Sequence, residues 1–384
     1  MKQTEQILLQ AIQKSLWGRD IAFSPDTDWK AVLDEAEKQT ILCIAISAAP
    51  AEYQSKYQSR AGFDVAHFIR ILHFQSALCE LFQANGIPMV ILKGTAAAIY
   101  YPNPMQRTMG DIDFLVPEES FERAKELLDL NGYRIAEDPL YPRHIEACKE
   151  GVSFEMHRFF TDDDGVDVDR FLFAGMQNRK TGRIYHSEFP MLPVMENGLV
   201  LLAHIAHHLR AGLGLRQMID WMMFVDQELD DELWLQSFKT AAEQTGLDKL
   251  ARTATKMCQM YLGLSDRINW CKDADSRLCA ELMDNLLSSG NFGKKRGSGL
   301  QVESAVSHLK RKGFRYLQQA GEYNWKAYHK HKWLKPFAWI YQIGRYARQG
   351  LQTKREGKQI IEDIGRGKKR SDLYQKLIPG QSKE

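Results

Sequence analysis

The chain has 384 residues, of which 44% are hydrophobic and 26% are charged, and its formal net charge is +2. This composition is typical of a globular protein and argues against both a disordered chain and bulk electrostatic binding of nucleic acid. The length exceeds that of most single cores, so it predicts two domains, or one domain with a large helical addition.

The sequence also indicates the compartment. Its six cysteines form no CxxC pair, which predicts reduced, mostly buried thiols rather than a zinc or redox motif. Residues 1–16 carry Lys2, Glu5 and Lys14 among their apolar residues and so lack the apolar core of a signal peptide. The chain has no run of the roughly 18 apolar residues that a transmembrane segment needs. These features predict a cytoplasmic protein.

The N-terminal part has a helical pattern. Apolar residues recur at three- and four-residue spacing in 4–16 and in 28–47, which predicts two amphipathic helices. A longer apolar stripe over 64–84 predicts a third helix, which Asn85 and Gly86 end.

From residue 87 the pattern changes to short apolar runs that are typical of strands. The predicted strands span 87–92, 110–116, 133–136 and 152–156. Residues 117–131 predict a helix, because a proline stands at their start and a glycine just after their end. From about residue 196 the pattern is helical almost to the end, apart from the Gly- and Ser-rich stretch 288–299, which predicts a flexible or substrate-facing loop.

Together these elements predict an α+β fold, with a small mixed β-sheet core, N-terminal helices and a large C-terminal helical portion. We expect an N-terminal helical region, an α+β core, a C-terminal helical domain and a basic, partly disordered tail. Their predicted bounds are 1–85, 86–195, 196–350 and 351–384.

Acidic residues in the predicted strands suggest a metal site. Asp111 and Asp113 are separated by one residue and so share one face of their strand, where two unpaired acids carry a like-charge cost. Glu155 lies in another predicted strand and can complete the cluster if the two strands pair. Such a group of acids is suited to magnesium, whereas an Asp-x-Asp pair alone is more often solvated surface.

The turn after the first strand suggests a phosphate site. Lys93, Gly94 and Thr95 stand between a buried strand and a helix start, where backbone N–H groups favour a phosphate. An ordinary strand-to-helix turn that needs glycine is the alternative.

Several short motifs occur together in this part of the chain. They are LKG at 92–94, Arg107, GDIDFLV at 110–116, NGY at 131–133 and FEMH at 154–157. Together they resemble the uncharacterised nucleotidyltransferase family of the DNA polymerase β-like nucleotidyltransferase superfamily. The resemblance spans about residues 65–300.

The resemblance implies roles for individual residues. Gly94 and Thr95 would stand for the Gly-Ser pair that positions the nucleotide phosphates. Asp111, Asp113 and Glu155 would be the catalytic carboxylates that bind two Mg²⁺ ions. Two positions depart from the superfamily pattern, since Thr95 replaces serine and Glu155 stands where aspartate is more usual.

The implied activity is transfer of a nucleoside monophosphate from a nucleoside triphosphate to an acceptor hydroxyl, with release of pyrophosphate. Lys93, Arg107 and Gly110 would contact the triphosphate, although Lys93 and Arg107 could instead pair with acids structurally. The acceptor could be a small molecule, a saccharide precursor or a protein. The alternative is a non-catalytic nucleotide-binding or regulatory module that keeps this fold.

Two later features stay open. His204, His207 and His208 share one helix face, and we expect that face to line the cleft or pack on the core rather than hold zinc. Arg216 and Asp220 follow at a spacing that suits an ion pair along the helix.

Segment 323–348 interleaves aromatic and basic residues. We expect its rings to pack on the body with the lysines outward, and peripheral membrane or single-stranded nucleic-acid contact is the alternative. The basic tail 354–383 also contains acids, which predicts a solvated end.

Overall fold

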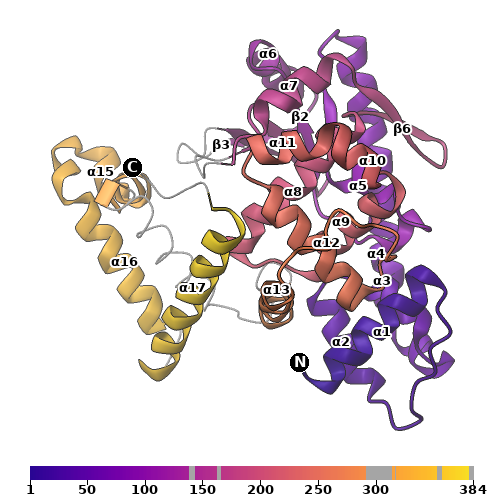
Figure 1. Cartoon of the computed structure of the whole chain (residues 1–384). Helices are drawn as coiled ribbons and strands as arrows, with labels where there is room; N and C mark the ends of the chain where they lie inside the picture. The colour runs from indigo at the N-terminus through magenta and orange to yellow at the C-terminus, as the bar shows by residue number, and fades with distance from the viewer. Residues whose placement is uncertain (138–142, 162–165, 291–313, 316, 353–356, 380–384) are drawn as a thin grey trace.

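The computed structural model describes residues 1–137, 143–161, 166–290, 314–315, 317–352 and 357–379 (Figure 1). At its centre is a seven-stranded mixed sheet with the order β3-β4-β5-β2-β1-β7-β6. The strands are β1 Val90–Leu92, β2 Ile112–Leu115, β3 Arg134–Glu137, β4 His144–Lys149, β5 Val152–His157, β6 Lys180–Ile184 and β7 Ser187–Met191. The pairs β2·β5 and β1·β7 are parallel and the other pairs are antiparallel. The predicted α+β class is confirmed.

The four predicted strands are all present, and the sheet contains three more. β1 begins at Val90 rather than at residue 87, which fits the lack of a ladder-forming N–H at Pro88. The additional strands are β4, β6 and β7. The sequence pattern missed them because polar and charged residues occupy much of each one, and β7 contains Pro190.

Helices precede and flank the sheet. Those before it are α1 Gln3–Trp17, α2 Trp29–Lys38, α3 Leu42–Ala45, a 3₁₀ turn at Ile46–Ala48 and α4 Ala51–Ala84. The predicted helix 28–47 is interrupted because Thr40 adopts a left-handed φ of 55°. The third helix begins at Ala51 and not at residue 64. Its first turns are mostly exposed, so they show no apolar stripe.

The two faces of the sheet have different partners. Helices α4 and α6 (Glu118–Leu130) pack on one face, where Phe114, Phe154 and Met156 are fully buried. The opposite face carries Leu92 and Leu115 into a second core that also includes the N-terminal helices and the helices after residue 194. Because side chains alternate along a strand, Asp113 and Glu155 belong to this second face.

The remaining helices lie between the strands of the sheet or after them in the chain. They are α5 Gly94–Ala98, a 3₁₀ turn at Pro104–Gln106, α7 Asp169–Gln177, α8 Val194–Ala211, α9 Leu215–Gln227, α10 Asp231–Leu233, a π-helical turn at Trp234–Phe238, α11 Lys239–Gln244, α12 Asp248–Leu262, α13 Ser276–Ser289, α15 Lys326–Lys330, a 3₁₀ turn at Lys332–Phe337, α16 Ala338–Gln352 and α17 Gly357–Leu377. The predicted C-terminal helical portion is confirmed. Among the helices of the described residues, none has both the length and the apolar composition needed to cross a bilayer.

The tail differs from its prediction. Residues 357–377 form helix α17, and Leu373, Tyr374 and Leu377 are buried in the core with α8, α12 and α13. Many lysines and arginines surround these apolar residues in the sequence, so the pattern looked like a solvated end. Most of the predicted loop 288–299 lies outside the described residues, and α13 ends at Ser289.

The aromatic residues of segment 323–348 are partly packed and partly exposed. Trp325 stacks on Tyr341 with ring centroids 5.2 Å apart, which is a contact within the segment and not with the body of the protein. Trp333 and Phe337 do not follow the packing prediction, since both are exposed. The cysteine prediction fits the structure, in which all six are free and four are buried.

Candidate active site

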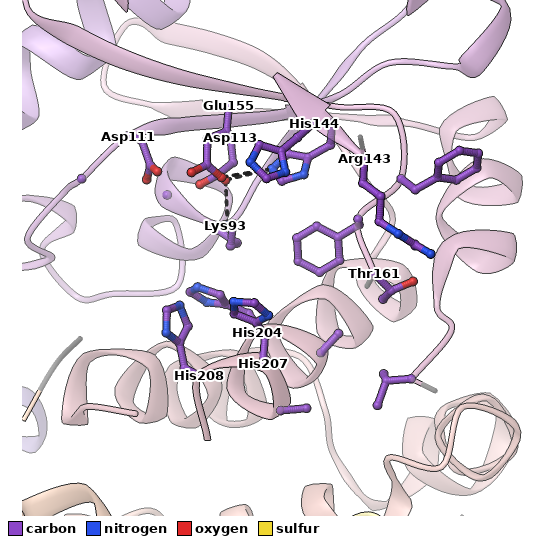
Figure 2. A pocket seen from close by; sticks show the side chains of 18 of the residues that line it. Lys93, Asp111, Asp113, Arg143, His144, Glu155, Thr161, His204, His207 and His208 are labelled. Carbon is purple, nitrogen blue, oxygen red and sulfur yellow. Dashed lines mark hydrogen bonds and ion pairs between the residues drawn. The ribbon is translucent and has the colours of Figure 1, made fainter. Parts of the chain in front are cut away.

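Strand register brings two of the predicted carboxylates together. β2 runs parallel to β5, and Asp113 is the direct partner of Glu155 in that pairing. His157 follows Glu155 on the same face of β5. One ligand atom from each of these three side chains lies within 4.8 Å of the other two. The side chains come from the sheet toward one cavity (Figure 2).

Asp111 lies beside this group, just before the first residue of β2. It lines the same cavity, so the predicted pair of aspartates faces one space (Figure 2). The negative charge of Asp113 and, next, burial raise the pKa of Asp111 above its usual value. A raised carboxyl pKa is the expected result of crowding acids on one sheet face.

Two cationic side chains contact the carboxylates. Lys93 Nζ lies 2.7 Å from Asp113 Oδ1. His157 Nε2 lies 3.1 Å from the same oxygen and 3.5 Å from Glu155 Oε2. Asp113 therefore has two nitrogen partners, and Glu155 shares one of them, His157.

These contacts decide the charge states. Burial would lower the pKa of His157, but its hydrogen bonds with Asp113 and Glu155 raise that pKa to about 9. Burial would raise the pKa of Glu155, but its contacts with His157 and Lys93 outweigh burial and lower the pKa to about 2. Lys93 is affected in the same way as His157, since burial is outweighed by Asp113 and its pKa is raised. Near neutral pH the ring of His157 is therefore protonated and Glu155 is ionised.

The turn between β1 and α5 holds Lys93 in a strained conformation. Its φ of 50° and ψ of −134° lie outside the regions that a residue with a side chain normally occupies. The next residue, Gly94, also has a positive φ of 36°. Backbone strain of this kind persists where surrounding structure enforces it, and it concentrates at functional sites. Here the turn places the Lys93 ammonium against Asp113.

Thr95 follows this turn but is fully buried. Its hydroxyl donates a hydrogen bond of 2.7 Å to Gln75 on α4. In this arrangement the hydroxyl faces α4 and not the cavity. The phosphate-binding role of Thr95 stays a prediction.

Arg107 is held by a buried ion pair. Its Nε and Nη2 each donate to one oxygen of Asp220 at 2.8 Å, and the Tyr101 hydroxyl donates to Asp220 at 2.7 Å. Arg107 is 3% exposed and yet lines the cavity. Its role toward a triphosphate stays a prediction, while the pair itself joins the loop before β2 to helix α9.

Further contacts fix the loop that carries Gly110. The oxygen of Gly110 lies 3.1 Å from His67 Nε2 on α4. Thr108 donates to Asp64 at 3.2 Å, and Arg216 donates to the backbone oxygen of Thr108 at 3.0 Å. The loop before β2 is thus attached to helices on both sides of the sheet.

The cavity has a volume of about 390 Å³. The acids form one wall, and His204, His207 and His208 of α8 form the facing wall (Figure 2). The prediction that this histidine face lines the cleft is confirmed. Burial and, next, neighbouring positive charge lower the pKa of His204 and of His208 well below 6.5, so both rings are neutral.

Several cavity residues were not predicted from the sequence. They are Arg143, His144, His157, Phe159, Phe160, Thr161 and Tyr374. His157 could have been found, because it lies two residues after Glu155 on the same strand face. Tyr374 comes from α17, and no local pattern connects that helix to the sheet.

A protein-family model described as an uncharacterised nucleotidyltransferase matches residues 25–263. The chain belongs to this family. The match includes the whole sheet and helices α8 and α9, while α13 to α17 lie beyond it.

No curated protein sequence matches the chain. Among solved structures, the chain is similar to an antigenic nucleotidyltransferase-like protein from Paracoccidioides brasiliensis. The identity is 13% and the TM-score is 0.33, over 52% of this chain and 94% of the other.

Proposed function

We propose that the chain transfers a nucleoside monophosphate from a nucleoside triphosphate to an acceptor hydroxyl, releasing pyrophosphate, with divalent metal ions at Asp111, Asp113 and Glu155. The observation that carries this proposal is the pairing of Asp113 with Glu155 on parallel strands, at the wall of a cavity that Lys93 and Asp111 also line. Phosphoryl transfer needs acids that hold metal ions, a cation that binds phosphate and a cavity that holds the substrate.

The donor set fits a hard divalent cation. Asp113 and Glu155 offer carboxylate oxygens within 4.8 Å of each other, and Asp111 adds a third carboxylate to the cavity wall. His157 adds a ring nitrogen to this group, but the carboxylate oxygens are the ligands that suit Mg²⁺. When bound, such an ion would neutralise phosphate charge and lower the pKa of the acceptor hydroxyl.

The chain's own residues have separate roles in this proposal. Lys93 is partly buried and charged at the end of β1, so it would bind the triphosphate oxygens next to Asp113. Gly94 lines the cavity without a side chain and would let phosphate approach the backbone. Glu155 is ionised, because its contacts with His157 and Lys93 lower its pKa, and it would orient the acceptor hydroxyl and assist removal of its proton.

A second cavity suggests where the acceptor would bind. It has a volume of about 490 Å³ over β3, β4 and β5, and Asp111 and Glu155 line both cavities. The two acids thus stand between two spaces. An in-line displacement needs the attacking and leaving oxygens on opposite sides of the phosphorus, so we assign the triphosphate to the first cavity and the acceptor to the second.

The competing function is a non-catalytic nucleotide-binding module. The contacts of Lys93 and His157 with Asp113 favour this module, because these two nitrogens already satisfy that carboxylate.

A titration separates nucleotide binding at these acids from binding elsewhere. Each of the four nucleoside triphosphates is titrated calorimetrically into the chain with magnesium, and the titration is repeated without it.

The variant for this titration is Asp111→Asn with Asp113→Asn, and its matched control is Glu126→Ala with Asp129→Ala on the exposed side of α6. We expect one triphosphate to bind only with magnesium, and binding to be lost in the first variant but kept in the control. Binding that needs neither magnesium nor the two aspartates would support the non-catalytic module.

A further inference from the structure

The C-terminal helices α15 and α16 leave one apolar face uncovered. Its members are Trp333, Phe337, Ile340 and Ile343, which are 71%, 49%, 48% and 45% exposed. We call this set the outer face. In Figure 1, α15 and α16 stand apart from the sheet and from helices α8 to α12.

Helical spacing places these side chains on one side of the segment. Phe337, Ile340 and Ile343 follow one another at three residues and so lie along one stripe of α16 and the turn before it. The opposite side is packed, since Trp325 stacks on Tyr341. The segment is therefore a folded amphipathic unit whose outer face has no cover among the described residues.

The charge of this unit identifies its partner. Residues 323–352 contain six lysines and arginines and neither aspartate nor glutamate, while Glu322, just before them, pairs with Lys335 at 3.9 Å. The basic residues are Lys326, Lys330, Lys332, Lys335, Arg345 and Arg348. The whole chain has 51 basic and 49 acidic side chains, so without these six its acids would outnumber its bases. An apolar face on a segment with such an excess of positive charge complements an anionic bilayer surface.

We propose that the outer face docks the chain on the surface of a membrane containing anionic phospholipid. The aromatic and aliphatic side chains would enter the headgroup region while Lys330 and Lys335, both exposed, would lie among the phosphates. The aliphatic members favour lipid over single-stranded nucleic acid, because bases stack on rings and gain little from Ile340 and Ile343. The attachment is peripheral and does not depend on the proposed catalytic activity.

Vesicle sedimentation tests this proposal with the full chain. Vesicles of phosphatidylcholine with phosphatidylglycerol are compared with vesicles of phosphatidylcholine alone. We expect binding to the anionic vesicles, weakened by added salt, and little binding to the neutral ones.

Two variants address the two parts of the surface. Trp333→Ser with Phe337→Ser removes apolar contact and should weaken binding by about tenfold or more. Lys330→Gln with Lys335→Gln should weaken it by about 30-fold. Leu235→Ser is the matched control, since Leu235 is 70% exposed elsewhere on the chain, and it should bind like the unchanged protein.

Circular dichroism establishes that each variant is folded before its binding is interpreted. The proposal is overturned if the unchanged chain binds neither kind of vesicle, or binds both equally. It is also overturned if both variants bind as well as the control. Binding of a single-stranded oligonucleotide in place of vesicles, or a dimer that the Trp333 variant dissociates without any vesicle binding, would assign the face to a different partner.

Discussion

The buried pair of Arg107 and Asp220 makes a sharp prediction about stability. Asp220 is 1% exposed and accepts hydrogen bonds from Arg107 and Tyr101. Asp220→Asn keeps the shape of the side chain but leaves the guanidinium of Arg107 without a counter-charge. Breaking a buried pair from one side costs about 3–5 kcal/mol, so we expect the free energy of unfolding to fall by that amount.

A double variant separates the pair from its parts. Arg107→Met with Asp220→Leu removes both charges of the pair, so neither partner is left buried without the other, and we expect it to be more stable than Asp220→Asn. Urea unfolding followed by circular dichroism measures both variants. The reasoning is refuted if Asp220→Asn loses less than about 1 kcal/mol, the level of an exposed pair, or if the double variant is the less stable one.

The same double variant tests the predicted role of Arg107. If Arg107 serves only to join the loop before β2 to α9, the folded double variant still binds the nucleoside triphosphate. If Arg107 also contacts the triphosphate, binding is lost although the protein is folded. Calorimetric titration with magnesium distinguishes these results.

Three further predictions concern the body of the protein. Because burial lowers the pKa of His204 and His208 well below 6.5, their contribution to stability is complete above about pH 6.5 and is lost as the pH falls below it. When the pH is lowered from about 7 to about 5.5, the free energy of unfolding of the unchanged chain should therefore fall by about 1–3 kcal/mol more than that of the variant His204→Gln with His208→Gln. Urea unfolding measures both, and an equal fall in the two proteins would contradict this. A Cβ on Gly198 would lie 2.6 Å from two phenylalanine rings, so Gly198→Ala should cost about 1–3 kcal/mol, whereas Gly62→Ala, in open space, should cost nothing. Tyr374→Ala should cost about 3–5 kcal/mol if α17 is packed as described, while a loss below about 0.5 kcal/mol would indicate a solvated tail.

Local pattern predicted the elements of the site well. The apolar runs around Asp113 and Glu155 identified β2 and β5, because buried strands have a composition that differs from helices and loops. The pairing of these two strands was only a hypothesis from the sequence, because strand order depends on contacts between distant residues. The structure shows that they pair. The same strand periodicity could have identified His157 as a further residue of the site.

Other features depend on tertiary contacts that no short segment contains. Thr95 sits at the expected turn, but its hydroxyl direction is set by Gln75 on a different helix. The spacing of Arg216 and Asp220 suggested a pair along one helix, but no spacing indicated that Asp220 accepts hydrogen bonds from Arg107, 113 residues earlier in the chain. Long-range partners of this kind decide the role of a polar residue, and sequence spacing does not reveal them.

Helix α17 is a similar case. Leu373, Tyr374 and Leu377 are few among many charged residues, so the composition of the tail indicated solvent exposure. Burial of these residues depends on an apolar surface of α8, α12 and α13 that the tail's own sequence does not show. Arg210 of α8 lies 3.6 Å from the centre of the Tyr374 ring, which links the tail to the helix that lines the cavity.

The most direct test of the proposed transfer follows the label of a nucleoside triphosphate. The chain is incubated with magnesium and with a cell extract freed of nucleotides, using triphosphate labelled in the α-phosphate in one reaction and in the γ-phosphate in another. We predict that the α-label passes to an acceptor and the γ-label leaves as pyrophosphate, and that Glu155→Gln abolishes both. Transfer of the γ-label to an acceptor, or α-label transfer that persists in the Glu155 variant, would contradict the proposed function.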